Sequence, residues 1–282
     1  MKSILIVGGS GTFGRAFIPV ALDAGVERIR IFSRGEHRQA EMREKWGDDA
    51  RVGWLIGDVR DKDRLTRAMQ GCDVVIHAAA IKRIETCEYD VVEMVKTNVS
   101  GAVNVVEAAT DAGVEKVVAL STDKACEPGV NAYGVGKALA ERIFLSANNS
   151  RGAHGPIFAC VRYGNIFASQ GSVVPRWQTL IARGHGEVPA TDPRATRFFM
   201  TPKQACDLVI QTIRKMKGGE LVIPDLPAYR LGDLAEAMEV DMRIIGMPEW
   251  EKKHESMKPG ETSEDARRMS VKELKAALEH VA

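Results

Sequence analysis

The sequence has almost no excess charge of either sign, few cysteines and no long apolar run. Its 39 Lys and Arg residues stand against 38 Asp and Glu residues, and the resulting net charge of +1 predicts no nucleic-acid partner. No run approaches the roughly 18 apolar residues of a membrane span, and the apolar run 4–7 is too short for a signal peptide. The five cysteines form no CxxC or Cys/His motif. We therefore expect reduced thiols, no metal site and a cytoplasmic location.

The chain is instead rich in short apolar runs that alternate with helix-like stretches. It has 282 residues, 45% of them hydrophobic, which is enough for a large core. The alternation predicts an α/β fold, a Rossmann-type doubly wound parallel sheet with helices on both faces. The expected strands are residues 3–7, 28–33, 52–56, 74–77, 116–121 and 158–162, and the longest expected helix is 88–111.

A glycine-rich turn follows the first expected strand. The run Gly8-Gly9-Ser10-Gly11-Thr12-Phe13-Gly14 stands between that strand and a helical stretch. Its glycines let the backbone approach a pyrophosphate, and the helix N-terminus offers N–H groups to the phosphates. We therefore predict a dinucleotide site formed by Gly8, Ser10, Gly11, Thr12, Phe13 and Gly14.

The composition changes after Asn165, where Pro and Gly become frequent. We expect a dinucleotide-binding domain over residues 1–165 and a smaller substrate-binding lobe over 166–282, with the chain able to cross between them. Within the lobe we expect helices 202–216 and 231–239, strands 221–223 and 243–245, and an amphipathic helix over the last dozen residues. The lobe should cover the carboxyl ends of the strands, where open α/β sheets bind ligands.

The end of the second expected strand indicates which dinucleotide binds. A NAD site usually has Asp or Glu there, which binds the ribose 2′-hydroxyl, whereas this chain has Ser33 and Arg34. A hydroxyl and a guanidinium suit the 2′-phosphate of NADP; the alternative is an exposed arginine at a strand end. Asp58 and Val59 are placed to meet the adenine, and the cofactor can pass close to the small residues Ala78, Ala79 and Ala80.

Five residues between the fifth expected strand and the next helix form a candidate reaction centre. Thr122, Asp123 and Lys124 follow the strand, and Tyr133 and Lys137 share one face of the helix. The Lys137 ammonium is expected to stabilise the Tyr133 phenolate and to lower its pKa toward that of a general base. Thr122 can bond the reacting oxygen. Asp123 beside Lys124 offers an acid and a base; the alternative is a solvated surface ion pair.

These residues resemble the short-chain dehydrogenase/reductase superfamily in its extended, sugar-nucleotide branch. Further motifs make the chain similar to the inverting UDP-N-acetylglucosamine 4,6-dehydratases of polysaccharide biosynthesis, and the Thr-Asp-Lys triplet sets such dehydratases apart from epimerases. The further motifs are Phe32-Ser33-Arg34, Gly57-Asp58-Val59-Arg60-Asp61, His77-Ala78-Ala79-Ala80, Lys96-Thr97-Asn98, Val161-Arg162-Tyr163-Gly164-Asn165, Gly171-Ser172-Val173-Val174-Pro175 and Thr196-Arg197-Phe198.

The resemblance implies transient oxidation at sugar C4 by bound NADP, loss of water across C5 and C6, and inversion at C5. Oxidation at C4 acidifies the C5 proton, because the resulting anion is conjugated with the ketone. Lys124 is the expected base at C5 and Asp123 the expected acid at the C6 hydroxyl, although a coupled pair can share these roles. The implied partner is a UDP-sugar, and we expect a homo-oligomer, a dimer or larger.

Other matched positions imply contacts with the cofactor and the substrate. Lys82, Asn98 and Tyr163 join Tyr133 and Lys137 around the cofactor; for Asn98 the alternative is that it only satisfies backbone groups. Arg197 matches an arginine that contacts phosphate, and the alternative is a structural arginine in a polar loop. The implied substrate-binding residues are Lys82, Asn165, Val173, Thr191, Arg197 and Glu255.

Three features depart from the family pattern. The loop 125–132 is one residue longer, with Pro128-Gly129 as its turn, and the C-terminal lobe is short. Pro248 and Trp250 replace the arginine and the glycine of the Arg-x-Gly-Glu-Lys-x-x-Glu segment. This replacement leaves the exact sugar and nucleotide of the substrate open. Trp250 either stacks on a base or packs in the protein. The alternatives are a sugar-nucleotide 4-epimerase or 5,6-dehydratase, and a non-catalytic NADP-binding regulator.

Overall fold

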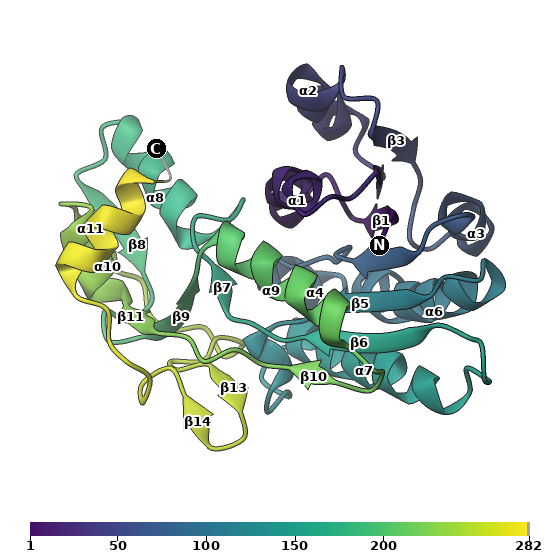
Figure 1. Ribbon diagram of the computed structural model, residues 1–282. Helices are drawn as coiled ribbons and strands as arrows, with labels where there is room; N and C mark the ends of the chain where they lie inside the picture. Colours follow the sequence, from purple (N-terminus) through teal and green to yellow (C-terminus); the bar gives the residue numbers. More distant parts are fainter. Residues whose placement is uncertain (281–282) are drawn as a thin grey trace.

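A computed structural model describes residues 1–280 as a parallel sheet between two layers of helices, with a smaller lobe at one end (Figure 1). The sheet has the strand order β10-β6-β5-β4-β1-β2-β3, and every neighbouring pair is parallel. Its largely apolar strands fit burial on both faces, so the predicted doubly wound α/β fold is confirmed. The strands are β1 (Ser3–Val7), β2 (Arg28–Ser33), β3 (Val52–Ile56), β4 (Val74–His77), β5 (Lys116–Leu120), β6 (Ile157–Val161) and β10 (Leu221–Val222).

Each face of the sheet has its own hydrophobic core. On one face, α1 (Thr12–Asp23) and α9 (Pro202–Lys215) pack side by side, together with Met42 of α2 (Glu36–Trp46). On the other face, the helices are α3 (Lys62–Met69), α6 (Gly101–Asp111) and α7 (Ala132–Ser146). The strand order reverses between β1 and β4, and open sheets bind ligands at the carboxyl ends of the strands on either side of such a reversal.

The single helix predicted over residues 88–111 is wrong, because the structure has four segments there. They are α4 (Ile84–Tyr89), α5 (Val91–Met94), the π-helical turn η1 (Val95–Ser100) and α6. Asp90 separates the first two, since its Oδ1 accepts a hydrogen bond of 3.2 Å from the N–H of Glu93 and so caps α5. Hydrophobic periodicity is nearly continuous through this stretch and does not reveal a cap inside it.

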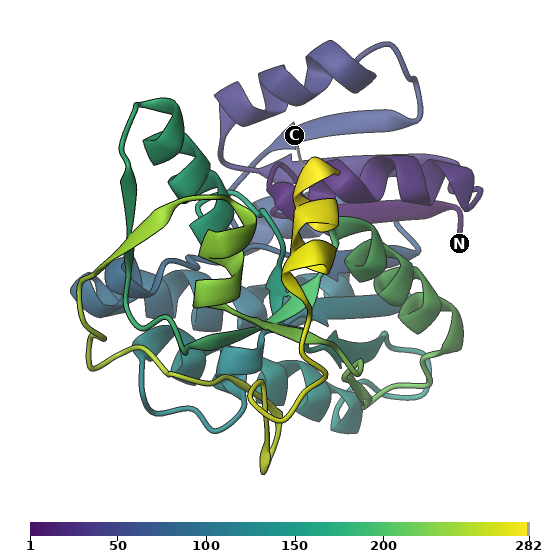
Figure 2. The ribbon, with the colours of Figure 1, turned by 90° about the vertical axis from the view of Figure 1, so that its left-hand side faces the viewer.

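The second lobe is built from small sheets and helices (Figure 2). α8 (Val173–Ala182), α10 (Leu231–Ala237) and α11 (Val271–Glu279) enclose a core that contains Trp177, Leu234 and Leu274. α11 is the predicted terminal helix, and residues 281–282 of that prediction lie outside the described residues. The lobe's strands are β7 (Asn165–Ile166), β9 (Thr196–Met200) and β11 (Ala228–Arg230), which form one sheet, β8 (Glu187–Ala190) with β12 (Asp241–Ile244), and β13 (Ser256–Lys258) with β14 (Glu261–Thr262).

The chain crosses between the two lobes. After β9, helix α9 packs on α1 and β10 joins the seven-stranded sheet, so residues 202–222 return to the first lobe. The division into domains at residue 165 therefore stays a prediction based on the sequence. Within residues 1–280, every helix is too short or too polar to cross a membrane.

Candidate active site

The glycine-rich turn between β1 and α1 has the geometry that a dinucleotide requires. Gly8 has a φ of 83°, and a Cβ at this position would lie 2.5 Å from the backbone nitrogen of Ala79. Gly11 is the N-cap residue of α1 and has no side chain to cap it. Among the hydrogen bonds of residues 1–280, none has the N–H of Thr12 or Phe13 as its donor to a residue before the helix. The turn thus offers N–H donors and a helix N-terminus to phosphate oxygens.

Ser33 and Arg34, at the end of β2, differ in accessibility. Ser33 is buried, and its Oγ accepts a hydrogen bond of 2.9 Å from Nε2 of Gln39. Arg34 is exposed, and its Nη1 lies 3.6 Å from Oδ2 of Asp58. Burial tends to raise the pKa of Asp58, but hydrogen bonds from Arg60 and the charge of Arg34 outweigh burial and lower it. Arg34 is therefore accessible to a phosphate group. The hydrogen bond between Gln39 and Ser33 was not expected from the sequence.

Asn98 fixes the loop that follows β4. Its Oδ1 accepts a hydrogen bond of 2.8 Å from the N–H of Ile81, and its Nδ2 donates one of 2.9 Å to the carbonyl oxygen of the same residue. Asn98 thus satisfies backbone groups, and its contact with the cofactor stays a prediction. The loop carries the half-buried Ala78, Ala79 and Ala80 and the exposed Lys82. Val59, expected near the adenine, is buried and faces Gly101 of α6.

A cap and two glycines hold helix α7 close to the predicted reaction centre. Oδ1 of Asn131 accepts a hydrogen bond of 2.7 Å from the N–H of Gly134. A Cβ at Gly134 would lie 2.5 Å from the carbonyl oxygen of Lys124, and a Cβ at Gly136 would lie 2.6 Å from Sδ of Met94. Glycine lowers helix propensity, but here it lets α7 approach the residues after β5 and the end of α5.

Tyr133 and Lys137 come to the carboxyl end of β5 on α7. Lys137 is buried, and its Nζ donates a hydrogen bond of 2.6 Å to the carbonyl oxygen of Leu120. Burial raises the pKa of Tyr133 to about 12, and the cation that opposes this effect is Lys124. The expectation that Lys137 lowers the Tyr133 pKa is therefore wrong for this structure, because burial dominates and the Lys137 ammonium is directed at a backbone carbonyl.

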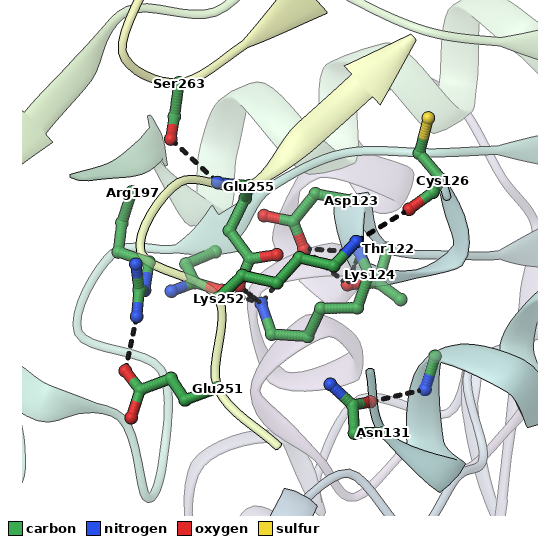
Figure 3. Close-up of polar contacts among 12 residues, drawn as sticks. Thr122, Asp123, Lys124, Cys126, Asn131, Arg197, Glu251, Lys252, Glu255 and Ser263 are labelled. Atoms are coloured by element: carbon green, nitrogen blue, oxygen red, sulfur yellow. Dashed lines mark hydrogen bonds and ion pairs between the residues drawn. The ribbon is translucent and has the colours of Figure 1, made fainter. Parts of the chain in front are cut away.

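Thr122, Asp123 and Lys124 form a buried cluster with residues from the second lobe (Figure 3). Oδ1 of Asp123 accepts hydrogen bonds from Oγ1 of Thr122 at 2.8 Å and from Nζ of Lys124 at 3.1 Å. The same Nζ lies 2.9 Å from Oε1 of Glu255 and 3.4 Å from Oδ1 of Asn165. Asp123 is 0% exposed and Glu255 is 2% exposed. The pair of Asp123 and Lys124 is therefore not a solvated surface ion pair.

Burial and charge together set the protonation of this cluster. Burial raises the pKa of Asp123 against the opposing charge of Lys124. Burial alone would lower the pKa of Lys124, but the carboxylates of Asp123 and Glu255 outweigh it and raise the pKa above its ordinary value. Burial acts to raise the pKa of Glu255, but the charges of Lys124 and Arg197 lower it. The arrangement favours an ammonium on Lys124 and a carboxylate on Glu255, whereas burial shifts Asp123 toward its protonated form.

Comparison with known proteins places these observations in a family. Residues 4–276 match the family described as polysaccharide biosynthesis protein. The chain belongs to this family. It is 44% identical over 259 residues, 91% of this chain and 77% of the relative, to the UDP-N-acetylglucosamine 4,6-dehydratase (inverting) of Campylobacter jejuni subsp. jejuni serotype O:23/36 (strain 81-176).

The chain is also similar to two further proteins. The chain is 38% identical over 266 residues, 91% of this chain and 77% of the relative, to a UDP-glucose 4-epimerase of Rickettsia prowazekii (strain Madrid E). It is also similar to the X-ray structure of Pen from Bacillus thuringiensis, with a TM-score of 0.91, 34% identity, and coverage of 99% of this chain and 98% of that chain.

In this family member, the guanidinium of Arg197 is engaged by protein groups. Its Nη2 pairs with Oε1 of Glu251, and its Nη1 donates to the carbonyl oxygens of Thr196 and Lys253 at 2.8 and 3.1 Å. Oγ1 of Thr191 donates to the same Glu251 oxygen at 3.3 Å. Arg197 thus lies buried in β9 and not in the polar loop of its alternative interpretation. Phosphate binding by Arg197 and Thr191 stays a prediction.

Tyr163 contributes to the site through its backbone, whereas Val173 is placed only at the start of α8. The Tyr163 side chain is buried in the core that also contains Phe13 and Cys206. Its backbone carbonyl accepts a hydrogen bond of 3.1 Å from the N–H of Asp123 and so fixes the start of the reaction centre. Val173 is the first residue of α8 and is half-buried.

The segment that departs from the family pattern is bonded to the lengthened loop. Nδ2 of Asn131 donates a hydrogen bond of 3.1 Å to the carbonyl oxygen of Trp250. Nζ of Lys252 donates to the carbonyl oxygens of Cys126 and Glu127 at 3.1 and 2.7 Å (Figure 3). Sequence reasoning missed Asn131, although an Asn directly before a helix is an N-cap signal. The two departures therefore lie against each other.

Proposed function

We propose that the protein is a sugar-nucleotide 4,6-dehydratase that converts UDP-N-acetylglucosamine, or a close relative, into a 4-keto-6-deoxy sugar nucleotide with inversion at C5. The observation that carries the proposal is the buried pair of Asp123 and Lys124 beside Tyr133. Elimination of water across C5 and C6 needs an acid and a base whose pKa values differ. The 44% identity to an inverting UDP-N-acetylglucosamine 4,6-dehydratase supports the same reaction.

The proposed cofactor is NADP, held by the glycine-rich turn and by the end of β2. The N–H donors of the turn and the N-terminus of α1 suit the pyrophosphate. The exposed guanidinium of Arg34 suits the 2′-phosphate, whereas Ser33 is buried and its Oγ is bonded to Gln39. Bound NADP would supply the acceptor for a hydride from C4 and would return the hydride at C6, so that it is not consumed.

The protein's own groups then divide the proton transfers. Tyr133 takes the proton of the C4 hydroxyl, and Thr122 bonds the same oxygen. Asp123, whose pKa burial raises, donates a proton to the departing C6 hydroxyl. Lys124 removes the C5 proton once its amine is neutral. The raised pKa of Asp123 suits its role as an acid. Tyr133 and Lys124 act as bases only after each has lost its proton, because the structure favours the phenol of Tyr133 and the ammonium of Lys124.

The proposal is tested by incubating the purified protein with UDP-N-acetylglucosamine and analysing the product by mass spectrometry and NMR. Loss of one water with a C6 methyl signal supports 4,6-dehydration. A 5,6-dehydratase gives an isomer of the same mass, which NMR distinguishes by its vinyl protons. A 4-epimerase gives no change in mass and an inverted C4 hydroxyl. Tight cofactor binding with no turnover on UDP-sugars would instead indicate a regulator.

We also propose that the protein is a cytoplasmic homo-oligomer. The helices from α4 to α7 pack together and expose apolar side chains, which is typical of a surface that another protein covers. A closed symmetric dimer or larger oligomer is the commonest way to bury such a surface. Light scattering coupled to size-exclusion chromatography measures the assembly. The exposed residues are Tyr89, Val91, Val92, Val95, Val135 and Leu139.

A further inference from the structure

The proposed reaction needs Lys124 as a neutral amine, but the structure favours its ammonium form. Nζ of Lys124 lies 3.1 Å from Oδ1 of Asp123 and 2.9 Å from Oε1 of Glu255, and 11% of the side chain is exposed. A buried ammonium between two carboxyl groups keeps its proton. The amine becomes available for C5 only if a neighbouring group accepts that proton.

Glu255 is better suited than Asp123 to accept it. Asp123 must itself give a proton to the C6 hydroxyl in the proposed reaction, so it enters the step already protonated. Within the described residues, each carboxyl group has one oxygen against Lys124 and one that is buried without a hydrogen-bond partner, so the role of Asp123 as the acid is what leaves Glu255 as the acceptor. Transfer of a proton from Lys124 to Glu255 turns a buried charged pair into a neutral one, which burial favours.

We infer that Glu255 accepts the proton that Lys124 must lose before its amine can remove the C5 proton. The inference rests on the proposed function and makes Glu255 a positioning residue, because it acts through Lys124. First, the Lys124 ammonium and the Glu255 carboxylate become an amine and a carboxylic acid. The amine then takes the C5 proton, the electrons of the C5–H bond form the C5–C6 double bond, and the C6–O bond breaks with a proton from Asp123 to give water. The summed charge of the three side chains is zero before and after.

The second lobe holds Glu255 in place through its backbone. The N–H of Glu255 donates a hydrogen bond of 3.0 Å to Oγ of Ser263, and the N–H of Ser263 donates one of 2.7 Å to the carbonyl oxygen of Glu255. Figure 3 shows the bond between Ser263 and the backbone nitrogen of Glu255. Ser263 is 0% exposed and also bonds Oγ1 of Thr196 at 2.6 Å. A carboxylate held this firmly can exchange a proton with Lys124 without a change of backbone.

Internal transfer has a consequence for pH dependence. The pKa of Glu255 is lowered and that of Lys124 is raised, so both side chains keep their charges over the neutral range. The transfer of a proton from Lys124 to Glu255 neither takes up a proton from solvent nor releases one to it. The rate of deuterium incorporation at C5 in the unaltered protein should therefore be independent of pH between about 6 and 9. The ionisable groups that face this pair are Asp123, Tyr133, Arg197, Tyr229 and Lys252.

The test is the Glu255→Gln variant of the full chain with bound cofactor. Glutamine keeps the size of the side chain and an acceptor oxygen but takes no proton, so Lys124 must release its proton to solvent. The rate of deuterium incorporation at C5 should then rise by about tenfold per pH unit over the range in which Lys124 titrates. At pH 6 it should lie at least tenfold below the unaltered rate, while C4 oxidation stays within about threefold.

Two further variants complete the experiment. Glu255→Asp keeps a carboxylate and should keep a pH-independent profile at a reduced rate. Glu264→Gln is the matched control, because this carboxylate lies 3.2 Å from Nε2 of His254 in the same part of the lobe and its side chain is 56% exposed; its profile should equal that of the unaltered protein.

Each remaining outcome overturns the inference. A pH-independent profile in Glu255→Gln, a rising profile in Glu255→Asp, or a change in KM alone would show that Glu255 does not accept the proton. Equal loss of C4 oxidation and C5 exchange in Glu255→Gln would assign Glu255 to folding or to substrate binding. If the unaltered protein removes no water from the UDP-sugar, the proposed function itself fails, which is a separate result.

Discussion

Arg162 neutralises a buried carboxylate on α7, the helix that carries Tyr133 and Lys137. Its Nε donates a hydrogen bond of 2.9 Å to Oε1 of Glu141, and its Nη2 donates one of 2.6 Å to Oε2. Its Nη1 donates at 2.9 Å to the carbonyl oxygen of Met257 in β13. The two side chains are 9% and 6% exposed. One guanidinium thus joins the sheet, the helix and the second lobe.

We predict that Arg162→Met strongly destabilises the protein. Methionine keeps much of the aliphatic volume, but both carboxylate oxygens of Glu141 lose their donors while remaining buried. Removal of one partner from a buried ion pair costs about 3–5 kcal/mol. The carbonyl of Met257 loses its donor as well, which costs about 1–3 kcal/mol where water does not replace it. Because globular proteins have a total stability of about 5–15 kcal/mol, we expect the free energy of unfolding to fall by at least about 3 kcal/mol.

Urea denaturation followed by circular dichroism measures this change. Arg194→Met is the control, because Arg194 also pairs with a carboxylate but its side chain is 73% exposed; we expect it to leave the free energy of unfolding unchanged. The double variant Arg162→Met with Glu141→Leu removes the buried charge together with its partner and should recover most of the loss. A loss below about 1 kcal/mol in Arg162→Met would refute the reasoning, because it would show that Glu141 is hydrated or neutral in the folded state.

Three further predictions concern the proposed reaction. Arg34→Asp should weaken NADP binding by more than tenfold, about 1.4 kcal/mol, in a calorimetric titration. Equal affinities of the unaltered protein for NADP and NAD would contradict the proposed preference for NADP. Tyr133→Phe and Lys137→Ala should each stop C4 oxidation, which is measured in a single turnover by the absorbance of the reduced cofactor. Oxidation at the unaltered rate in both variants would exclude Tyr133 and Lys137 as the oxidising centre. Asp123→Asn and Lys124→Ala should keep C4 oxidation but slow dehydration by about 10²–10⁴-fold. Dehydration by the Lys124→Ala variant at close to the unaltered rate would exclude Lys124 as the C5 base.

The fold could be predicted because its signals are local. The apolar run before Gly8 and the glycine turn after it specify a strand, a turn and a helix within a short stretch of chain. The other five strands expected in the central sheet lie where the structure has β2 to β6, with ends that differ by at most one residue. The break at Asp90 was missed because a single cap interrupts an otherwise continuous helical pattern.

The electrostatics of the site could not be predicted from spacing. Tyr133 and Lys137 stand four residues apart, but the structure directs Lys137 to Leu120, and burial raises the Tyr133 pKa. Arg197 has the residue type of a phosphate ligand, yet its partner Glu251 comes from a segment 54 residues further along the chain. Such partners are decided by tertiary packing, which a local pattern does not contain.

The departures from the family pattern fall at positions different from those that handle protons. Pro248 and Trp250 stand where the sequence analysis expects the arginine and the glycine of the family segment, and the carbonyl oxygen of Trp250 accepts a hydrogen bond from Asn131. Lys252 and Glu255 keep the residue types of the pattern, and they bond the loop after Lys124 and Lys124 itself. A substitution of the Trp250 side chain can therefore test the two interpretations, stacking on a base or packing in the protein, without removing an acid or base group. The structure consequently supports the proposed type of reaction more directly than the proposed nucleotide, and the half-exposed Trp250 is the position at which specificity is best examined.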